Sequence, residues 1–309
     1  MRRLIVLLPL LSLTFACLPA ASSTAPSLEP PTPTRVSLQA LGAYHATFEM
    51  HFEGAYSWTY RLESRSDGSA MAYDLHIEGV KASQNPGDVR IVVEGDIAKM
   101  RGPGTDDVCM QFPSDLDLGL SLLTPDDLIP LQGTEISLRS TGVEVIVGME
   151  ATHYTLRQPN LESWQDVEVD IWEDVATGAV LRHDLRAAGM DPLFDAGEGV
   201  LSGQFVVDDI GPQTIEPVSG CETDLPLPPD ATRIVKMPSL VAFESTATPS
   251  EIVGFYQAAL VEVGWESTAE PETGIDATLL SYHRGEQTLD INIESRETGV
   301  HVELLLSEE

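Results

Sequence analysis

Apolar and polar residues alternate one by one through much of this sequence, and this period of two limits the fold more than any other feature. In the clearest stretch, Tyr44 to Glu53, each apolar side chain is followed by a polar or charged one. Successive side chains of a β-strand point to opposite faces, so the pattern predicts a strand with one buried face and one wet face. The same alternation, with turn signals between the segments, predicts strands over Tyr56–Leu62, Met71–Ile77 and Val89–Val93.

Four further segments with this alternation lie between Val143 and Arg186. In one of them, Val167, Val169 and Ile171 alternate with acidic residues. We expect antiparallel strands that extend the same sheet, the last two joined as a hairpin. The predicted strands cover Val143–Met149, Thr152–Arg157, Val167–Trp172 and Ala179–Arg186.

Helical patterns are scarce in the first two thirds of the chain. The two candidates are Ser114–Leu123 and Thr124–Leu131, and each begins with a hydroxyl residue followed three positions later by an aspartate. Leu120 and Leu123 fall on one helical stripe that would cover part of the sheet. Two short helices are little cover for so many apolar strands. Such a sheet folds on itself, encloses a cavity, or meets a partner.

The N-terminal residues have the composition of an export signal followed by a tether. Two arginines precede Leu4–Ala16, an apolar run shorter than the about 20 residues that a membrane-spanning helix needs. The run ends at Cys17 in a pattern that resembles the lipobox of bacterial lipoproteins, so we expect residues 1–16 to be removed and Cys17 to carry a palmitate-type lipid. The alternative is an ordinary signal peptide cut after Ala16 or at Ala20-Ala21. Residues 17–35, rich in Pro, Ser and Thr, then form a flexible tether.

The charge of the chain bears on its partners. There are 49 acidic and 17 basic side chains, for a net charge of −32. Nucleic acid is not an expected partner, because phosphate binding relies on clusters of basic residues. An anionic membrane surface would repel the folded part. We therefore expect the lipid at Cys17, and not a basic patch, to hold the protein on the outer face of the bacterial cell membrane.

Sequence motifs of enzymes are missing. The chain has no G-x-S-x-G, no H-E-x-x-H, no P-loop and no G-x-G-x-x-G. Asp191, Asp195 and Glu198 lie near two glycines and could suggest a cation loop, but they lack the spacing of an EF-hand, which favours a solvated acidic turn. We expect no enzymatic activity, no catalytic residue, no cofactor and no metal.

Three cysteines are present. If Cys17 carries the lipid, Cys109 and Cys221 are the two that remain in an exported chain, and we expect them to form a disulfide. The bond would close a long loop and stabilise the fold by about 4–5 kcal/mol in the chain-entropy model. The alternative is a pair of unpaired buried thiols, because the sequence does not show whether their backbones approach each other.

Prolines at residues 224–231 indicate a linker between a large domain, 36–223, and a small one, 232–309. In the small domain Thr248 and Glu251 form a capping box that predicts the start of a helix. The expected strands are Arg233–Met237, Val241–Glu244, Thr278–His283, Thr288–Glu294 and Val300–Leu306. The order ββαβββ predicts an α+β sandwich, which looks like an accessory module of several bacterial exported lipoproteins.

Several segments together resemble a known family. Gly142–Leu156, with the sequence GVEVIVGMEATHYTL, is similar to a strand pair of the LppX/LprA/LprF/LprG family of bacterial lipoproteins. Val169–Leu185 looks like the hairpin that follows in that family, and Gly203–Ile210 with Ile215–Val218 looks like its usual ending. The resemblance covers about residues 36–218. The small domain, the acidity and Cys109 are not features of the family.

The resemblance implies a LolA/LolB-like fold, a strongly curved antiparallel half-barrel with short helices plugging its open side. It also implies an acylated lipid or glycolipid held in a hydrophobic cavity and presented or transferred, with a lipid exporter or envelope protein as a partner. Leu120 and Leu123 would form the lid. The residues expected to line the cavity are Phe48, Met50, Phe52, Tyr56, Trp58, Tyr60, Met71, Tyr73, Leu75, Val145, Val147, Val169 and Ile171. The alternative is a non-enzymatic interaction or sensor scaffold whose sheet closes over an ordinary core.

Overall fold

The computed structural model describes residues 38–79, 87–102, 108–115, 138–161 and 164–308. The large domain begins with a 3-10 turn, Leu38–Leu41, and its described part then consists of strands. The strands are β1 Ala43–Glu53, β2 Ser57–Asp67, β3 Ala70–Glu78, β4 Val89–Glu94, β5 Ile97–Arg101, β6 Cys109–Pro113, β7 Arg139–Ile146, β8 Met149–Leu161, β9 Trp164–Asp174, β10 Val180–Met190 and β11 Glu198–Ile210.

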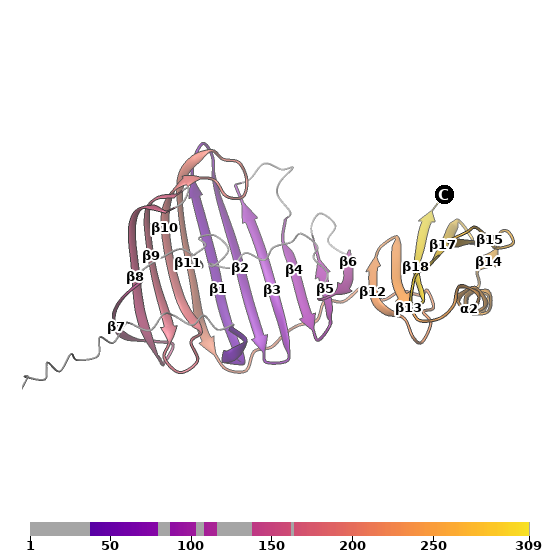
Figure 1. Cartoon of the computed structure of the whole chain (residues 1–309), viewed down its shortest axis with the longest axis horizontal. Helices are drawn as coiled ribbons and strands as arrows, with labels where there is room; N and C mark the ends of the chain where they lie inside the picture. Colours follow the sequence, from indigo (N-terminus) through magenta and orange to yellow (C-terminus); the bar gives the residue numbers. More distant parts are fainter. Residues whose placement is uncertain (1–37, 80–86, 103–107, 116–137, 162–163, 309) are drawn as a thin grey trace, which may run out of the picture. The chain divides into compact units, whose positions relative to one another are not determined.

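These strands form one antiparallel sheet in the order β7-β8-β9-β10-β11-β1-β2-β3-β4-β5-β6. Neighbours in the sheet are mostly neighbours in the sequence. The exception is β11, which returns to pair with β1 so that Phe205 lies opposite Phe48. Figure 1 shows the sheet as a single curved layer. The predicted fold class, a mainly β chain built on a curved antiparallel half-barrel, is confirmed, whereas the predicted plugging helices fall largely on 116–137, outside the described residues.

The predicted strand Val143–Met149 is wrong at its end. β7 stops at Ile146, and Met149 already belongs to β8. Between them Val147 has φ 51° and Gly148 has φ 80°. Two consecutive residues with positive φ are typical of the tight turns that join antiparallel strands. The alternation of apolar residues therefore continues across a turn. Two short strands, β5 and β6, were not predicted at all.

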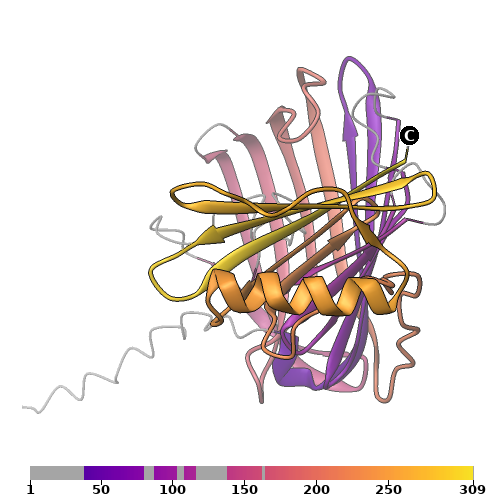
Figure 2. The same ribbon diagram turned by 90° about the vertical axis from the view of Figure 1, so that its right-hand side faces the viewer.

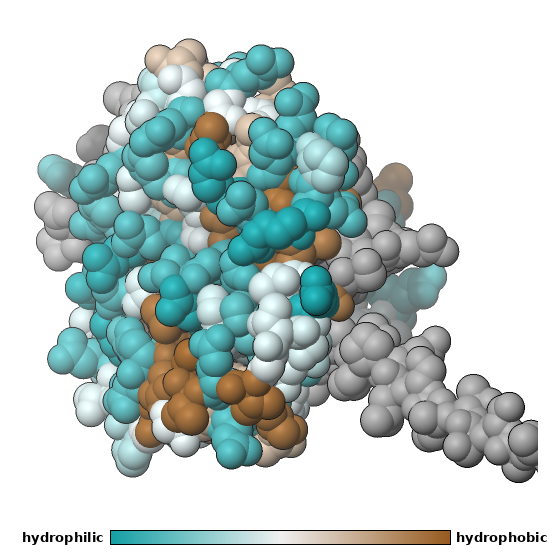
Figure 3. Space-filling view, turned by 90° about the vertical axis from the view of Figure 1, so that its left-hand side faces the viewer, coloured by the Kyte–Doolittle hydropathy of each residue, from teal (hydrophilic) through white to brown (hydrophobic). Residues whose placement is uncertain are grey.

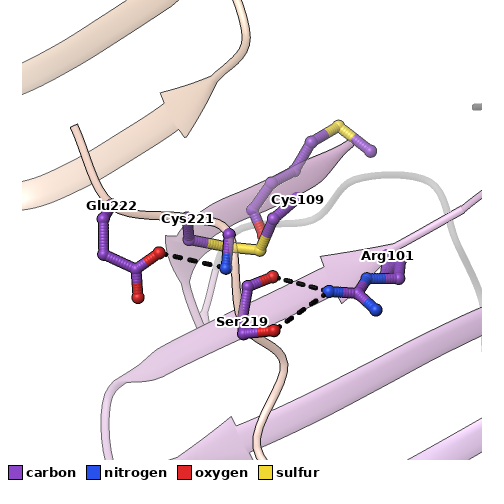
Figure 4. The surroundings of a disulfide bond; sticks show 7 residues. Arg101, Cys109, Ser219, Cys221 and Glu222 are labelled. Atoms are coloured by element: carbon purple, nitrogen blue, oxygen red, sulfur yellow. Dashed lines mark hydrogen bonds between the residues drawn. A yellow bond between two sulfur atoms is a disulfide. The ribbon is translucent and has the colours of Figure 1, made fainter. Parts of the chain in front are cut away.

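A segment of residues 211–222, here called the strap, follows β11 and lies on the face of the sheet that carries Ala72 and Val92. Val218 and Cys221 of the strap are buried against these two residues and Cys109. The predicted disulfide between Cys109 and Cys221 is confirmed, with the two Cα atoms 4.9 Å apart (Figure 4). Because Cys109 begins β6, the bond fastens the strap to the last strand of the large domain, which also pairs with β12 through Gln111 and Lys236.

The small domain has its own core. Its elements are β12 Thr232–Met237, β13 Leu240–Ser245, α2 Pro249–Glu262, β14 Glu266–Ser267, β15 Glu272–Thr273, β16 Ala277–Arg284, β17 Gln287–Ser295 and β18 Val300–Glu308. The strands pair as β12-β13-β18-β17-β16, with β14 and β15 each paired to β16. Figure 2 shows α2 as the single coiled ribbon beside the strands of this domain. Ile252, Tyr256 and Leu260 of α2 are buried in the core of the domain. The order ββαβββ is confirmed, with two additional short strands.

The capping box at the start of α2 is also present. Thr248 accepts a hydrogen bond from the Glu251 backbone N–H, and Glu251 accepts one from the Thr248 backbone N–H. Among the described residues, none of the helices is both long enough and apolar enough to cross a membrane.

Candidate functional site

The inner face of the large sheet is the side to which Phe48, Met50 and Tyr60 point, and it carries the candidate site. In-register pairing places one row of side chains straight across eight strands. This row contains Tyr154, Ile171, His183, Phe205, Phe48, Leu62, Leu75 and Val89. A second row, two residues further along, contains Leu156, Val169, Leu185, Gly203, Met50, Tyr60 and Ile77. The inner face is thus a wide, nearly continuous apolar surface.

Most of the residues predicted to line a cavity lie on this face. Seven are buried: Phe48, Met50, Phe52, Trp58, Tyr60, Val169 and Ile171. Four are partly buried and pack against them: Tyr56, Met71, Tyr73 and Leu75. The period of two explains the agreement, since one correct residue on a strand assigns the face of the others. The predicted lid residues, Leu120 and Leu123, lie outside the described residues.

Two of the predicted lining residues are exposed and do not belong to the buried surface. Val145 is 68% exposed, and Val147 lies in the turn between β7 and β8 and is 39% exposed. Within the described residues β7 pairs only with β8, which makes it an edge strand. A side chain on an edge strand has a neighbour on one side only, so it faces solvent although its alternation is that of a buried strand. Figure 3 views the molecule from this side and shows apolar patches among hydrophilic surface.

The prediction from the sequence also omitted residues of the inner face. Leu181, His183 and Leu185 alternate along β10, and Leu201 and Phe205 occupy β11. All five are buried. The alternation of Leu181 and Leu185 was available in the sequence and would have placed His183 on the inner face, although histidine is usually assigned to a polar face. The β11 residues are separated by Gly203, which interrupts the apolar pattern.

One end of the inner face is closed by aromatic rings. Phe52 and Trp58 stack at 5.7 Å between ring centroids, and Phe194 meets the Trp58 ring edge-on at 5.1 Å. The Trp58 indole N–H donates to the Asp191 carboxylate at 3.1 Å. Asp191 also accepts from the backbone N–H groups of Leu193 and Ala196. Asp191 therefore organises the loop that carries Phe194. Among the described residues, no group of three or more His, Cys, Asp or Glu side chains could hold a metal ion.

Three phenol groups of the inner face are held in their uncharged form. Burial, with a smaller contribution from Tyr73, raises the pKa of Tyr44 to about 12. Burial also raises the pKa of Tyr73, and burial together with the Glu173 carboxylate raises that of Tyr154. A phenol that stays protonated offers a neutral hydroxyl. This surface suits an uncharged, apolar ligand or an apolar core.

The outer face is chemically different. Trp172 there is stacked on His153, with ring centroids 4.3 Å apart, and the Arg182 guanidinium lies 4.7 Å from the Trp172 ring centroid. The Trp172 indole N–H donates to Glu144, which is also 3.0 Å from His153. These contacts connect four neighbouring strands, β7 to β10, on the outer face.

Comparison with known proteins adds little to this geometry. A family model described as START domain-like matches residues 230–299, which are in the small domain. No curated protein sequence matches the chain. Similar solved structures include a DUF1329 family protein from Desulfovibrio piger, at 12% identity and TM-score 0.22 over 55% of this chain and 88% of that one.

Two structures of MucB bound to MucA are also similar. The complex from Pseudomonas aeruginosa shares 12% identity at a TM-score of 0.25, covering 87% of this chain and 89% of that one. MucB in complex with MucA(peri) shares 13% identity at a TM-score of 0.28, covering 87% and 90%. At these scores none of the similarities carries an argument about this chain, and the resemblance to the LppX/LprG family stays an interpretation of the sequence.

Proposed function

We propose that the inner face of the large domain binds the acyl chains of a lipid or glycolipid, which the protein presents or transfers outside the cell while Cys17 anchors it to the membrane. The observation that carries the proposal is the pair of in-register rows across the inner face, which are apolar from β8 to β3 apart from His183 and the phenols. The resemblance to lipid-carrying lipoproteins supports the same function. A lipid exporter or another envelope protein would load or receive the lipid.

The energetics of such a site are favourable. Each methylene moved from water onto an apolar surface contributes about 0.8 kcal/mol. A chain of fifteen methylenes therefore gains on the order of 12 kcal/mol before the losses of translational and conformational entropy. This gain requires no charged contact, and the raised pKa of Tyr44 fits a site with neutral hydroxyls only. We expect modest selectivity for the head group.

A closed core in an interaction or sensor scaffold is the second candidate function, and burial favours it. Phe48, Met50, Phe52, Trp58 and Tyr60 are at most 3% exposed. Side chains this buried have full sets of neighbours, as the residues of an ordinary core do. The two functions differ in what fills the space above the inner face: a removable lipid or the protein itself.

Gly203 offers a way to separate the two functions. It lies in the second row between Leu185 and Met50. A Cβ added there would meet the Met50 Cγ at 3.4 Å, which is ordinary contact, so Gly203→Ala should be tolerated. In Gly203→Leu a larger side chain enters the space above the sheet. The neighbouring change Gln204→Leu, on an exposed position of the same strand, is the matched control.

The measurement is native mass spectrometry of protein purified from its membrane in mild detergent, with thermal unfolding before and after lipid removal. In a lipid site, Gly203→Leu reduces the co-purifying lipid while the lipid-free protein unfolds at the wild-type temperature. In a closed core, the same change overpacks the interior and costs about 1–3 kcal/mol, and wild-type protein carries no lipid. Trp58→Asp gives a second comparison: it abolishes lipid retention in a site but unfolds the domain in a core.

A further inference from the structure

The inward-pointing residues of β2 change character along the strand. At its start they are Trp58 and Tyr60, and at its end they are Ser64 and Ser66, both of them buried. Small hydroxyl residues thus replace large rings at the end of the sheet that lies away from Phe52 and Trp58. In Figure 1 this is the lower end, where the β2–β3 and β4–β5 turns lie.

A pocket of about 300 Å³ lies at this end of the inner face and is here called the rim pocket. In-register pairing places three of its lining residues, Ser66, Met71 and Val93, in one row across β2, β3 and β4. This row is on the face that carries Leu62 and Leu75, so the rim pocket is continuous with the proposed lipid site. The other lining residues belong to the turns at this end of the sheet: Gln39, Gly42, Gly68, Ser69, Ala70 and Gly95.

The hydrogen-bond donors of the β2–β3 turn are already used within the protein. The Ser66 hydroxyl donates to the Gly42 carbonyl at 2.9 Å, and Ser66 Oγ accepts from the Gly68 N–H at 3.1 Å. The Ser69 hydroxyl and N–H both donate to the Asp67 carboxylate, as does the next backbone N–H. A hydroxyl oxygen that has donated its proton can still accept a hydrogen bond. The turn therefore offers a ligand acceptors and not donors.

The charges around the rim pocket disfavour an anion. None of the described residues that line it is charged, in a protein with a net charge of −32. Carboxylates adjoin it in the sequence, since Asp67 precedes Gly68 and since Glu94 and Asp96 flank Gly95. A phosphate carries negative charge and accepting oxygens, so it would meet neither a cation of the lining nor a donor of the β2–β3 turn.

We propose that the rim pocket holds the head group of the bound lipid, and that this head group is uncharged, free of phosphate and bears hydroxyls, as glycerol or a sugar does. The proposal rests on lipid binding at the inner face. Hydroxyl protons of the ligand are donated to the oxygens of Ser66 and Ser69. The acyl chains supply most of the affinity, and the rim pocket adds the preference for one head group over another.

The length of the inner face fits this arrangement. The acyl chains extend from Met71 toward Phe52 and Trp58, where the aromatic rings close the face. Along β1, Tyr44 and Phe52 are about 26 Å apart at about 3.3 Å per residue. A lipid chain spans about 15 Å, half the hydrocarbon core of a bilayer. A chain that begins at the rim pocket therefore fits on the inner face.

Lipids that share the same pair of oleoyl chains test the head group. Dioleoylglycerol carries a free hydroxyl, its acetyl ester lacks the hydroxyl proton, and dioleoylphosphatidic acid carries a phosphate instead. Equal amounts compete for full-length protein freed of co-purified lipid in mild detergent, and native mass spectrometry gives the ratio of bound lipids. The wild type should retain dioleoylglycerol about fivefold over each competitor, as expected for a single hydrogen bond. A further excess of galactosyl-dioleoylglycerol over dioleoylglycerol assigns a sugar, and its absence assigns glycerol.

A lysine in the rim pocket should reverse the preference. Ser69→Lys places a cation beside the head group and should shift the bound ratio about fivefold or more toward phosphatidic acid. Ser57→Lys is the matched control, because it adds the same charge at an exposed serine at the other end of β2, and it should shift the ratio less than about twofold. Should the lysine disturb the turn, Ser69→Ala removes the accepting hydroxyl and should lower the preference for dioleoylglycerol over its acetyl ester about threefold.

The outcomes separate this proposal from lipid binding itself. Equal retention of dioleoylglycerol and either competitor by the wild type overturns the proposal for the rim pocket, and so does an equal shift in Ser69→Lys and Ser57→Lys. Both results leave lipid binding at the inner face intact. Failure of the wild type to retain any of these lipids overturns both proposals.

Discussion

Removal of the Cys109–Cys221 bond should destabilise the large domain strongly without changing its folded structure. The bond joins residues 112 positions apart. In the chain-entropy model, opening a loop of this length releases about 16 cal/mol/K to the unfolded chain, or about 5 kcal/mol at 25 °C. Measured losses for native disulfides fall between about 2 and 5 kcal/mol, so we expect Cys109→Ala with Cys221→Ala to cost about 3–5 kcal/mol.

The folded strap should stay in place in this variant. Val218 remains buried against Ala72 and Val92. Arg90 donates to the Glu216 carbonyl at 3.0 Å, and Arg101 donates to the Ser219 carbonyl at 2.8 Å. The loss therefore arises mainly in the unfolded state, which becomes less compact. A steeper dependence of the unfolding free energy on urea should accompany it.

Tryptophan fluorescence can follow the large domain alone. Three of the four tryptophans, Trp58, Trp164 and Trp172, lie in that domain, and Trp265 lies in the small one. In a Trp265→Phe background, the fluorescence follows unfolding of the large domain only. Urea unfolding is then compared for the oxidised protein, the reduced protein and the double alanine variant. The reduced protein and the variant should agree within about 1 kcal/mol.

Two results would refute this reasoning. A loss below about 1 kcal/mol would mean that the bond does not restrict the unfolded chain. A large loss in the variant with an unchanged urea dependence, accompanied by altered near-ultraviolet circular dichroism, would place the effect in the folded state. The strap contacts, and not the closed loop, would then be the source of the stability.

Two further predictions concern the anchor and the pH dependence. Cys17→Ser should move the protein from the membrane fraction to the soluble fraction, because two or more acyl chains anchor stably; an unchanged membrane fraction contradicts lipidation. Hydrogen bonds from the backbone N–H groups of Ala70 and Ser69, and from the Ser69 hydroxyl, lower the pKa of Asp67. The Asp67 carboxylate therefore stabilises the β2–β3 turn at pH values above its unfolded pKa of about 3.9. This stabilisation is lost as the pH falls through the lower pKa of the folded state. Between pH 5 and 2, the free energy of unfolding from urea titrations should therefore fall less for Asp67→Asn than for the wild type. An identical fall in both proteins would show that the Asp67 carboxylate does not cause the pH dependence.

Much of the inner face could be predicted because it depends on local alternation. A strand in which Phe48 points inward must turn Met50 and Phe52 inward as well, whatever its neighbours are. The helix from Pro249 was equally predictable, since a capping box and a proline at its first turn act within one turn of backbone. The exposed Val145 shows where this reasoning stops. Its alternation is that of a buried residue, and the residues around it in the sequence do not reveal that it lies on an edge strand.

The sequence by itself determined most strands of the large domain, the inward-pointing face of those strands and the two cysteines available for a disulfide, because these follow from residue type and short-range geometry. Only the tertiary structure decided that β11 returns to β1, that the strap crosses the outer face, and that Arg101 lies opposite Arg90. Each of these depends on pairing between segments far apart in the chain. Such pairing is selected by the packing of whole faces and by the entropy of closing long loops, which no local pattern records.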